Sequence, residues 1–369
     1  MAQYVQAGTA QLALSFVEIE KKFFDLPFQS IGSIYFKKDV PPDLQAPLYR
    51  VDTESSQDSE TFCIGPTVDY MFWRGKRTSF CRGPWNDPND YVISIAYKEI
   101  EWTQRYGKPL ELDFPHNGVF PGKKFPEDYL HLLDKYLTLT PYLLPKDADS
   151  ALNRPTLCHP VEPRLLVAGY PRAFENPDAE QSPRLEEPSF PPDYESLPAE
   201  KKVEADELHR RRLLFYYYRV FNSHLNKAHL QALHAPILFP RQHLVDRAGR
   251  QWSGNLMTLK GALVRMVDHW PHLPDTKGIP CPVKFTATEL DGFSEQEQLW
   301  FDLNKVVNHW WEQIGGVGED GWVSNDLYEE AVQKVAELKA SLIASAEGDE
   351  EDIRLLEKGW PFRDREEIN

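Results

Sequence analysis

The sequence predicts a mainly α-helical protein with one small β-hairpin. Long segments repeat apolar residues every three or four positions, as amphipathic helices do, and only two short runs have a β-like composition. Hydrophobic residues make up 41% of the 369 residues, which is ample for a buried core. We expect one domain over residues 1–346, followed by an acidic tail over residues 347–369.

The first predicted elements are a helix and the hairpin. The helix has apolar residues at spacings of four, three and four: Leu12, Phe16, Ile19 and Phe23. Two β-like runs follow at 33–36 and 61–64, with a polar segment between them. We expect these two runs to pair.

The middle of the chain predicts two helices and an extended stretch. Asp87 and Pro88 indicate a helix start, because an N-cap residue is followed by proline at the first helical position, and Gly107 indicates its end. A second helix is expected from Pro126 to Pro141. Residues 153–198 contain ten prolines and little periodicity, so we expect an extended Pro-rich stretch there.

Four helical segments are expected in the last part of the chain: 199–233, 256–266, 294–314 and 326–342. Ser294 and Glu297 have the spacing of a capping box, which places the start of the third segment at Ser294. Its predicted apolar stripe consists of Leu299, Leu303, Val306, Trp310 and Ile314.

Charge and hydropathy restrict the classes of partner. The formal net charge is −16, which disfavours nucleic acid and anionic membrane surfaces as partners. Residues 209–212 are basic and residues 215–218 are aromatic, but acidic residues just ahead of them favour a solvated helix face over an RNA-binding surface. No apolar run approaches 18 residues, the length of a membrane-spanning helix. Together with the net charge, this predicts neither a nucleic-acid nor a membrane partner.

The cysteine and histidine patterns predict no metal site. The four cysteines are scattered, which is typical of reduced intracellular thiols. His224, His229 and His234 are five residues apart, so on a helix they point in different directions and cannot converge on one ion. Acidic residues precede the first lysine, as no mitochondrial presequence would allow, so a cytoplasmic location is expected for the chain as written.

Several motifs together resemble a known family. They are Ser30 to Phe36, Phe62 to Pro66, Arg82 to Trp85, Lys98 to Trp102, Ala168 to Pro171, Arg210 to Tyr218 and Glu357 to Phe362. With Pro155 to Pro160, these segments resemble the fungal branch of the aminoglycoside-phosphotransferase-like family, which includes the altered inheritance of mitochondria proteins. The resemblance spans nearly the whole chain and implies a possible mitochondrial location.

The resemblance implies the helical large lobe of a protein-kinase-like fold and a phosphotransferase activity that uses ATP and Mg²⁺. Members of the family have a small ATP-binding lobe, a catalytic loop with the pattern H-x-D-x-x-x-x-N and a later metal-binding Asp. In phosphoryl transfer, the first Asp orients the attacking hydroxyl, whereas the Asn and the second Asp hold the metal.

This sequence departs from that pattern at the catalytic loop. His159 matches the histidine, but Val161 stands at the Asp position and Leu166 at the Asn position, and neither side chain can accept a proton or bind magnesium. The sequence then continues directly into a segment that follows the metal-binding Asp in the family, so a block is absent. No counterpart of the ATP-binding lobe precedes the first helix.

We therefore expect a catalytically inactive member, a pseudokinase with no intact catalytic residue, with His159 as a relic, and with no bound cofactor or metal. Two alternatives stay open: a pseudoenzyme that acts as a binding or scaffold protein for an unknown small molecule or protein, and an incomplete gene model of an active kinase. An incomplete lobe would expose apolar surface, which favours self-association.

Overall fold

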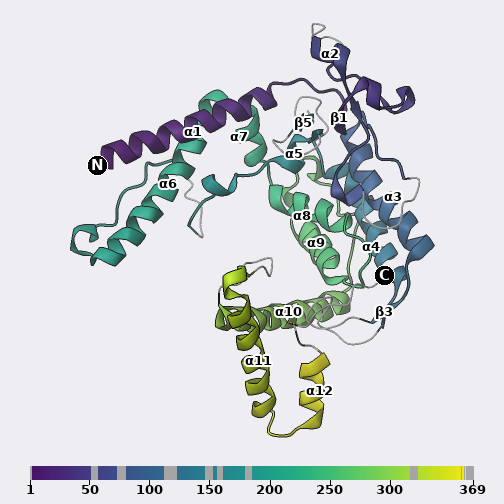
Figure 1. Ribbon diagram of the computed structural model, residues 1–369. Coiled ribbons are helices and arrows are strands. Elements are labelled where there is room, and N and C mark those ends of the chain that lie inside the picture. The colour runs from purple at the N-terminus through teal and green to yellow at the C-terminus, as the bar shows by residue number, and fades with distance from the viewer. Residues whose placement is uncertain are drawn as a thin grey trace. The chain divides into compact units, whose positions relative to one another are not determined.

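The computed structural model describes residues 2–50, 57–72, 80–111, 123–145, 153–155, 161–178, 185–315, 323–358, 360 and 362. It confirms a mainly α-helical fold with small antiparallel strand pairs (Figure 1). The helices are α1 (Ala2–Phe24), α2 (Gln57–Thr61), α3 (Pro88–Tyr106), α4 (Pro126–Leu139), α5 (Arg164–Val167), α6 (Ala199–Leu225), α7 (Lys227–Leu233), α8 (Leu238–Ala248), α9 (Met257–Asp268), α10 (Ala287–Ile314), α11 (Tyr328–Ser345) and α12 (Glu350–Lys358). The strands are β1 (Ser33–Phe36), β2 (Phe62–Gly65), β3 (Leu110–Glu111), β4 (Lys123–Lys124), β5 (Asn153–Pro155) and β6 (Val161–Pro163).

The chain forms two compact units, and each combines three separate stretches of sequence. Unit 1 comprises Met1–Lys98, Leu137–Gly249 and His269–Pro280; unit 2 comprises Glu99–Tyr136, Arg250–Asp268 and Cys281–Asn369. The single domain over 1–346 and the tail over 347–369 stay predictions.

In unit 1, α1 packs along α6 (Figure 1), and Phe16 of the predicted stripe takes part in the contact, because its ring centroid lies 6.3 Å from that of Tyr218 on α6. Among the α1 side chains described from residue 8 onward, the buried ones are Thr9, Ala13, Val17 and Phe24. Of the predicted stripe, Phe16 and Phe23 are half-buried, whereas Leu12 and Ile19 are 54% and 47% exposed, so the prediction was wrong at Leu12 and Ile19. The helix is apolar on two sides, and periodicity alone does not tell which side packs.

The predicted hairpin strands do pair in unit 1. β1 and β2 are antiparallel, with Ser33 opposite Gly65 and Phe36 opposite Phe62. Beneath this pair lies a fully apolar cluster of Phe28, Leu48, Ile64 and Val161. The same cluster thus joins the β1–β2 region to β6, which comes about a hundred residues later in the sequence.

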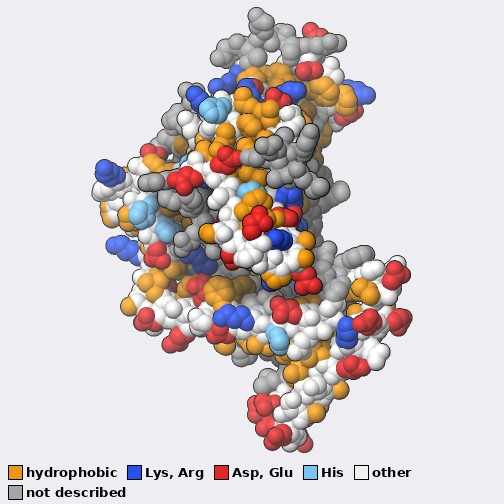
Figure 2. Space-filling model, turned by 90° about the vertical axis from the view of Figure 1, so that its left-hand side faces the viewer, with side chains coloured by type: hydrophobic (Ala, Val, Ile, Leu, Met, Phe, Trp, Pro, Cys, Tyr) orange, Lys and Arg blue, Asp and Glu red, His pale blue; other side chains and the backbone are white. Residues whose placement is uncertain are grey.

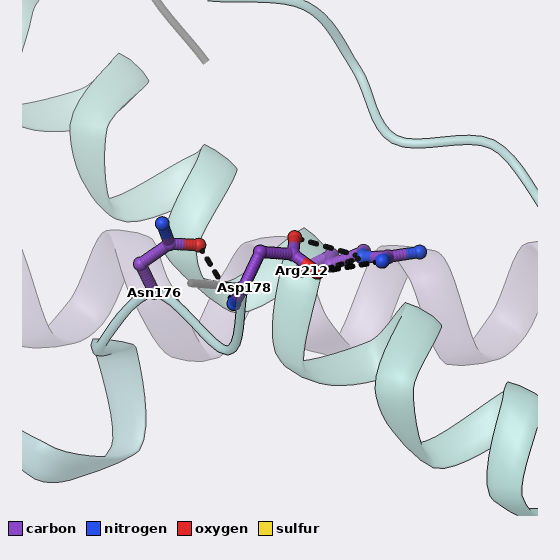
Figure 3. A network of polar contacts seen from close by, with 3 residues as sticks. All are labelled: Asn176, Asp178 and Arg212. Atoms are coloured by element: carbon purple, nitrogen blue, oxygen red, sulfur yellow. Dashed lines mark hydrogen bonds and ion pairs between the residues drawn. The ribbon is translucent and has the colours of Figure 1, made fainter. Parts of the chain in front are cut away.

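The described residues of the predicted extended stretch, 153–155, 161–178 and 185–198, form only short elements, and an ion pair attaches them to α6. Arg212 donates two hydrogen bonds to the Asp178 carboxylate, at 2.6 Å from Nη2 to Oδ1 and 2.9 Å from Nε to Oδ2 (Figure 3). Asn176 Oδ1 accepts from the Asp178 backbone N–H at 3.2 Å and orders the same turn. The Arg212 guanidinium lowers the pKa of Asp178, as a two-pronged arginine contact does.

In unit 2, α10 starts earlier than predicted. Thr286 and Glu289 form the capping box: Thr286 Oγ1 accepts from Glu289 N at 3.2 Å, and Glu289 Oε2 accepts from Thr286 N at 2.7 Å. Ser294 therefore lies inside the helix, and the predicted start was wrong. The pairs Thr286/Glu289 and Ser294/Glu297 both have the capping-box spacing. The upstream pair forms the cap because residues 287–293 are helical as well.

The predicted apolar stripe of α10 is only partly buried. Ile314 is buried, and Leu303 and Trp310 are half-buried, but Leu299 and Val306 are exposed. At the end of the chain, Trp360 is 4% exposed and its ring centroid lies 5.9 Å from that of Trp310.

The acidic segment near the C-terminus is partly helical. It forms the turn between α11 and α12 and the first residues of α12, and its red side chains gather at the lower end of Figure 2: Glu347, Asp349, Glu350, Glu351 and Asp352. Asp349 caps α12, because its Oδ1 accepts from the backbone N–H groups of Glu351 and Asp352.

Trp310→Ala is expected to lower the free energy of unfolding by about 2 to 3 kcal/mol, because the residue is half-buried and a fully buried tryptophan costs about 3 to 5 kcal/mol on truncation to Ala. Urea unfolding monitored by circular dichroism measures this loss. Trp360→Ala, at a buried position, is the matched comparison and should cost more. A loss below about 1 kcal/mol for Trp310→Ala would mean that the two indoles do not pack.

Candidate functional site

The candidate site is the segment around β6, where the family resemblance places the catalytic loop. His159 lies outside the described residues. Val161 is fully buried in the apolar cluster with Phe28, Leu48 and Ile64. Its backbone is held in place as well: Gly32 N donates to Val161 O at 3.0 Å, and Val161 N donates to Gly32 O at 2.7 Å. The position predicted to match the catalytic Asp is therefore a core position.

Leu166 stands in α5, and its side chain is half-buried. The amide of Gln242, on α8, holds this short helix by donating to Leu165 O at 2.8 Å, to Leu166 O at 3.3 Å and to Ala168 O at 2.7 Å. The segment therefore has a defined conformation, but its two predicted positions present aliphatic side chains that bind neither a proton nor a metal.

Sequence reasoning missed Glu162, which lies between Val161 and Pro163 on β6. Tyr91 Oη donates to Glu162 Oε1 at 3.4 Å, and the Asp69 carboxyl is near enough for its charge to act on the same group. Burial, followed by the nearby Asp69 charge, raises the pKa of Glu162 to about 8. Glu162 thus holds a proton at neutral pH, next to a second carboxyl group. An alternating strand pattern could have identified Glu162 as a glutamate in an apolar run. It could not have identified Tyr91 and Asp69 as its partners.

A protonated carboxyl beside a carboxylate can donate and accept a proton, but it does not form the metal site of a kinase. Within the described residues, no three or more His, Cys, Asp or Glu side chains come together in a way that could hold an ion. Of the three evenly spaced histidines, His224 and His234 are exposed and His229 is buried.

Glu162→Gln tests this assignment through the pH dependence of stability. The folded pKa of about 8 lies above the unfolded value of about 4.5, so the wild type loses stability as the pH rises from about 4.5 to about 8. Glutamine does not titrate. The free energy of unfolding of the variant, relative to that of the wild type, should therefore rise by about 3 kcal/mol between about pH 5 and about pH 8. Urea unfolding at the two pH values measures this gain.

The control for that experiment is Glu175→Gln, at an exposed position of the same unit. Its free energy of unfolding should follow that of the wild type at both pH values. If Glu162→Gln also followed the wild type, Glu162 would be ionised at neutral pH and open to water.

The basic and aromatic face of α6 is engaged within the chain. Arg210 pairs with Glu207 at 2.7 Å, and Arg212 pairs with Asp178. Phe215 and Tyr218 are buried. The arrangement is that of a packed aromatic side next to neutralised cations, as on many surface helices.

The chain is similar to two groups of fungal proteins. It is 25% identical to a subtelomeric hrmA-associated cluster protein of Aspergillus fumigatus, over 96% of this chain and 77% of that protein. It is 21% and 22% identical to the proteins named altered inheritance of mitochondria protein 9, mitochondrial, of Zygosaccharomyces rouxii and Candida albicans, over 86% and 85% of this chain. It spans 55% of the length of each of these two yeast proteins.

No protein-family model matches the chain, and no solved structure matches it. In the part of the chain that the structure describes, no helix is long and apolar enough to cross a membrane. The chain is therefore related by sequence to fungal proteins, two of them named as mitochondrial.

Proposed function

We propose that this chain is a relative of the aminoglycoside-phosphotransferase-like kinases that does not transfer phosphoryl groups and instead works as a binding or scaffold protein. One observation supports the proposal above all others. Val161, at the position of the catalytic Asp, is a fully buried core residue whose backbone is bonded to Gly32.

The chemistry of phosphoryl transfer explains why that observation matters. The protein contributes mainly positioning and charge neutralisation, so the reaction needs a carboxylate that reaches the attacking hydroxyl and oxygen ligands that hold Mg²⁺. Val161 and Leu166 offer neither, and Val161 faces the core rather than a substrate. The half-buried Glu162, which keeps its proton at neutral pH, does not replace them.

A protein partner fits the surface better than a small molecule does. Large apolar side chains on α10 and α11 are 42% to 57% exposed: Leu299, Phe301, Val306, Tyr328 and Val332. Exposed apolar side chains in such numbers are typical of surfaces that associate with other proteins, including other copies of the same chain.

An active kinase encoded by a longer form of this protein is the second candidate. The alignment with the Aspergillus fumigatus relative is 418 positions long, which exceeds the 369 residues of this chain. The relative therefore carries residues that this chain lacks within the aligned region, in keeping with an absent block after Pro160. For that longer form, a mitochondrial location would follow from the names of the yeast relatives. The transcript and the intact mass of the natural protein would show whether the block exists.

A phosphoryl-transfer assay tests the main proposal. The purified chain is incubated with Mg²⁺ and γ-labelled ATP and a panel of hydroxyl compounds, including sugars, aminoglycosides and protein serines. We expect transfer at the background of a heat-denatured sample. Saturable turnover that co-elutes with the chain in size-exclusion chromatography would overturn the proposal and favour the second candidate.

A further inference from the structure

Three polar side chains form a chain of hydrogen bonds in unit 1, in which Tyr218 and His229 are buried and Glu20 is half-buried. Tyr218 Oη, on α6, lies 3.0 Å and 2.8 Å from the two carboxyl oxygens of Glu20 on α1. The same oxygen lies 2.9 Å from Nε2 of His229 on α7. Tyr218 is fully buried and His229 is 2% exposed, so neither can contact a dissolved substrate. The chain connects three helices through a single hydroxyl group.

The single proton of that hydroxyl limits the chain to two arrangements. If Tyr218 donates to Glu20, its oxygen must accept from His229, which requires the proton of the neutral imidazole on Nε2. If Tyr218 donates to His229, the imidazole proton is on Nδ1 and the Glu20 carboxyl must supply a proton to the hydroxyl oxygen. In the described structure, His229 Nδ1 has no hydrogen-bond partner, so no other contact fixes the tautomer.

The surroundings favour a change between these arrangements near neutral pH. The described titratable groups around the chain are Tyr218 on α6, His229 on α7, Arg164 on α5 and Tyr170 after α5. Burial raises the pKa of Glu20 to about 7, against a lowering by the Tyr218 hydrogen bond. Burial, followed by the Arg164 charge, lowers the pKa of His229 to about 4, so His229 stays neutral when Glu20 titrates.

We propose that Glu20, Tyr218 and His229 form a proton relay that makes the attachment of α1 to α6 and α7 sensitive to pH. When the network loses one proton, the Glu20 proton passes to the Tyr218 oxygen, the Tyr218 hydroxyl proton passes to His229 Nε2, and the proton on Nδ1 is released to solvent. This leaves a Glu20 carboxylate, a Tyr218 hydroxyl that donates to it, and a neutral His229 protonated on Nε2. A charged carboxylate then lies in the buried helix contact, and α1 is held less firmly. This inference goes beyond the proposed binding function and does not depend on it.

The first test observes the tautomer of His229 in the wild-type chain. Nitrogen chemical shifts of ¹⁵N-histidine-labelled protein distinguish the two neutral tautomers. Between about pH 5.5 and about pH 8 the protonated nitrogen should change from Nδ1 to Nε2, and the midpoint should match the titration of the Glu20 carboxyl. Tyr218→Phe should abolish the change, because it removes the hydroxyl that transmits it. A His229 tautomer that stays the same while Glu20 titrates would overturn the proposal.

The second test measures how firmly α1 is held, by hydrogen exchange of its backbone amides corrected for the intrinsic rate at each pH. Glu20→Gln mimics the neutral carboxyl. The opening constant of the wild type relative to this variant should rise roughly 30-fold between about pH 5.5 and about pH 8. Effects of His229 are present in both proteins and cancel in the ratio. Glu18→Gln, exposed on the same helix, should behave like the wild type. A ratio that does not change with pH would overturn the proposal.

Discussion

Val161→Asp is expected to destabilise the chain by about 4 kcal/mol or more, because it places a carboxylate in a dry apolar cluster. The total stability of a folded domain is only about 5 to 15 kcal/mol, so a large fraction of the variant could be unfolded. The substitution is of special interest because it introduces the residue type that the family resemblance predicts for this position. Restoring one residue by itself should thus damage the protein instead of repairing it.

Two comparisons make this expectation specific. Val161→Ala removes apolar contacts without adding a charge, so it should cost less than Val161→Asp in urea unfolding. Leu166→Asp, at a half-buried position, should also cost less. Any folded fraction of Val161→Asp should show phosphoryl transfer at background, since no three or more His, Cys, Asp or Glu side chains of the described residues come together to hold an ion. An undiminished stability, or turnover that the parent chain lacks, would show that Val161 faces an open site.

Gly32→Ala is expected to lower the free energy of unfolding by about 3 kcal/mol. The backbone of Gly65 lies where the new side chain would have to fit. A Cβ atom at Gly32 would lie 2.2 Å from Gly65 O and 3.0 Å from Ile64 Cγ2. The φ angle of 152° is also one that residues with side chains rarely adopt. The β1–β2 pair and the bridge to Val161 would both have to shift, which makes this a substitution with an unusually large effect for one methyl group.

Gly169→Ala is the matched control for that substitution. No atom lies within 4 Å of the Cβ position at Gly169, and the variant should lie within about 1 kcal/mol of the wild type. Guanidinium or urea unfolding of both variants measures the difference. Equal effects at Gly32 and Gly169 would mean that the backbones of β1 and β2 are not in close contact.

Elements with strong local signals were predictable from the sequence. α3 begins at Pro88 as expected, and Asp87 Oδ1 accepts from Asn89 N at 2.8 Å, as an N-terminal cap should. The two β-like runs pair within one residue of the predicted bounds. In these cases the residues that determine the element lie within it or next to it.

Features that depend on distant parts of the chain were not predictable. The packed side of α1 is decided by α6, nearly two hundred residues later, so the sequence of α1 alone did not show that Leu12 and Ile19 are exposed. α8 was missed because it follows a left-handed residue, Ile237, and has a proline in its first turn, Pro240, where a helix tolerates it.

The candidate site also combines features that the sequence predicts with features that depend on the fold. That Val161 cannot serve as the catalytic base follows from its residue type and was expected from the sequence. That it fills a core with Phe28 and Ile64 required the fold. The proton on Glu162 depends on Asp69 and Tyr91, which are far from it in sequence and come together only in the folded chain.

The most direct test of the central claim is the effect of Mg-ATP on the melting temperature. A ligand at 100 times its dissociation constant stabilises the folded state by about 2.7 kcal/mol, which shifts the melting temperature by several degrees. We expect no saturable shift with Mg-ATP, and the same result with EDTA present, because Val161 and Leu166, at the positions predicted for the catalytic Asp and Asn, offer no ligand for the metal. A saturable, magnesium-dependent rise in the melting temperature would contradict the account, since it would require a nucleotide site elsewhere in the chain.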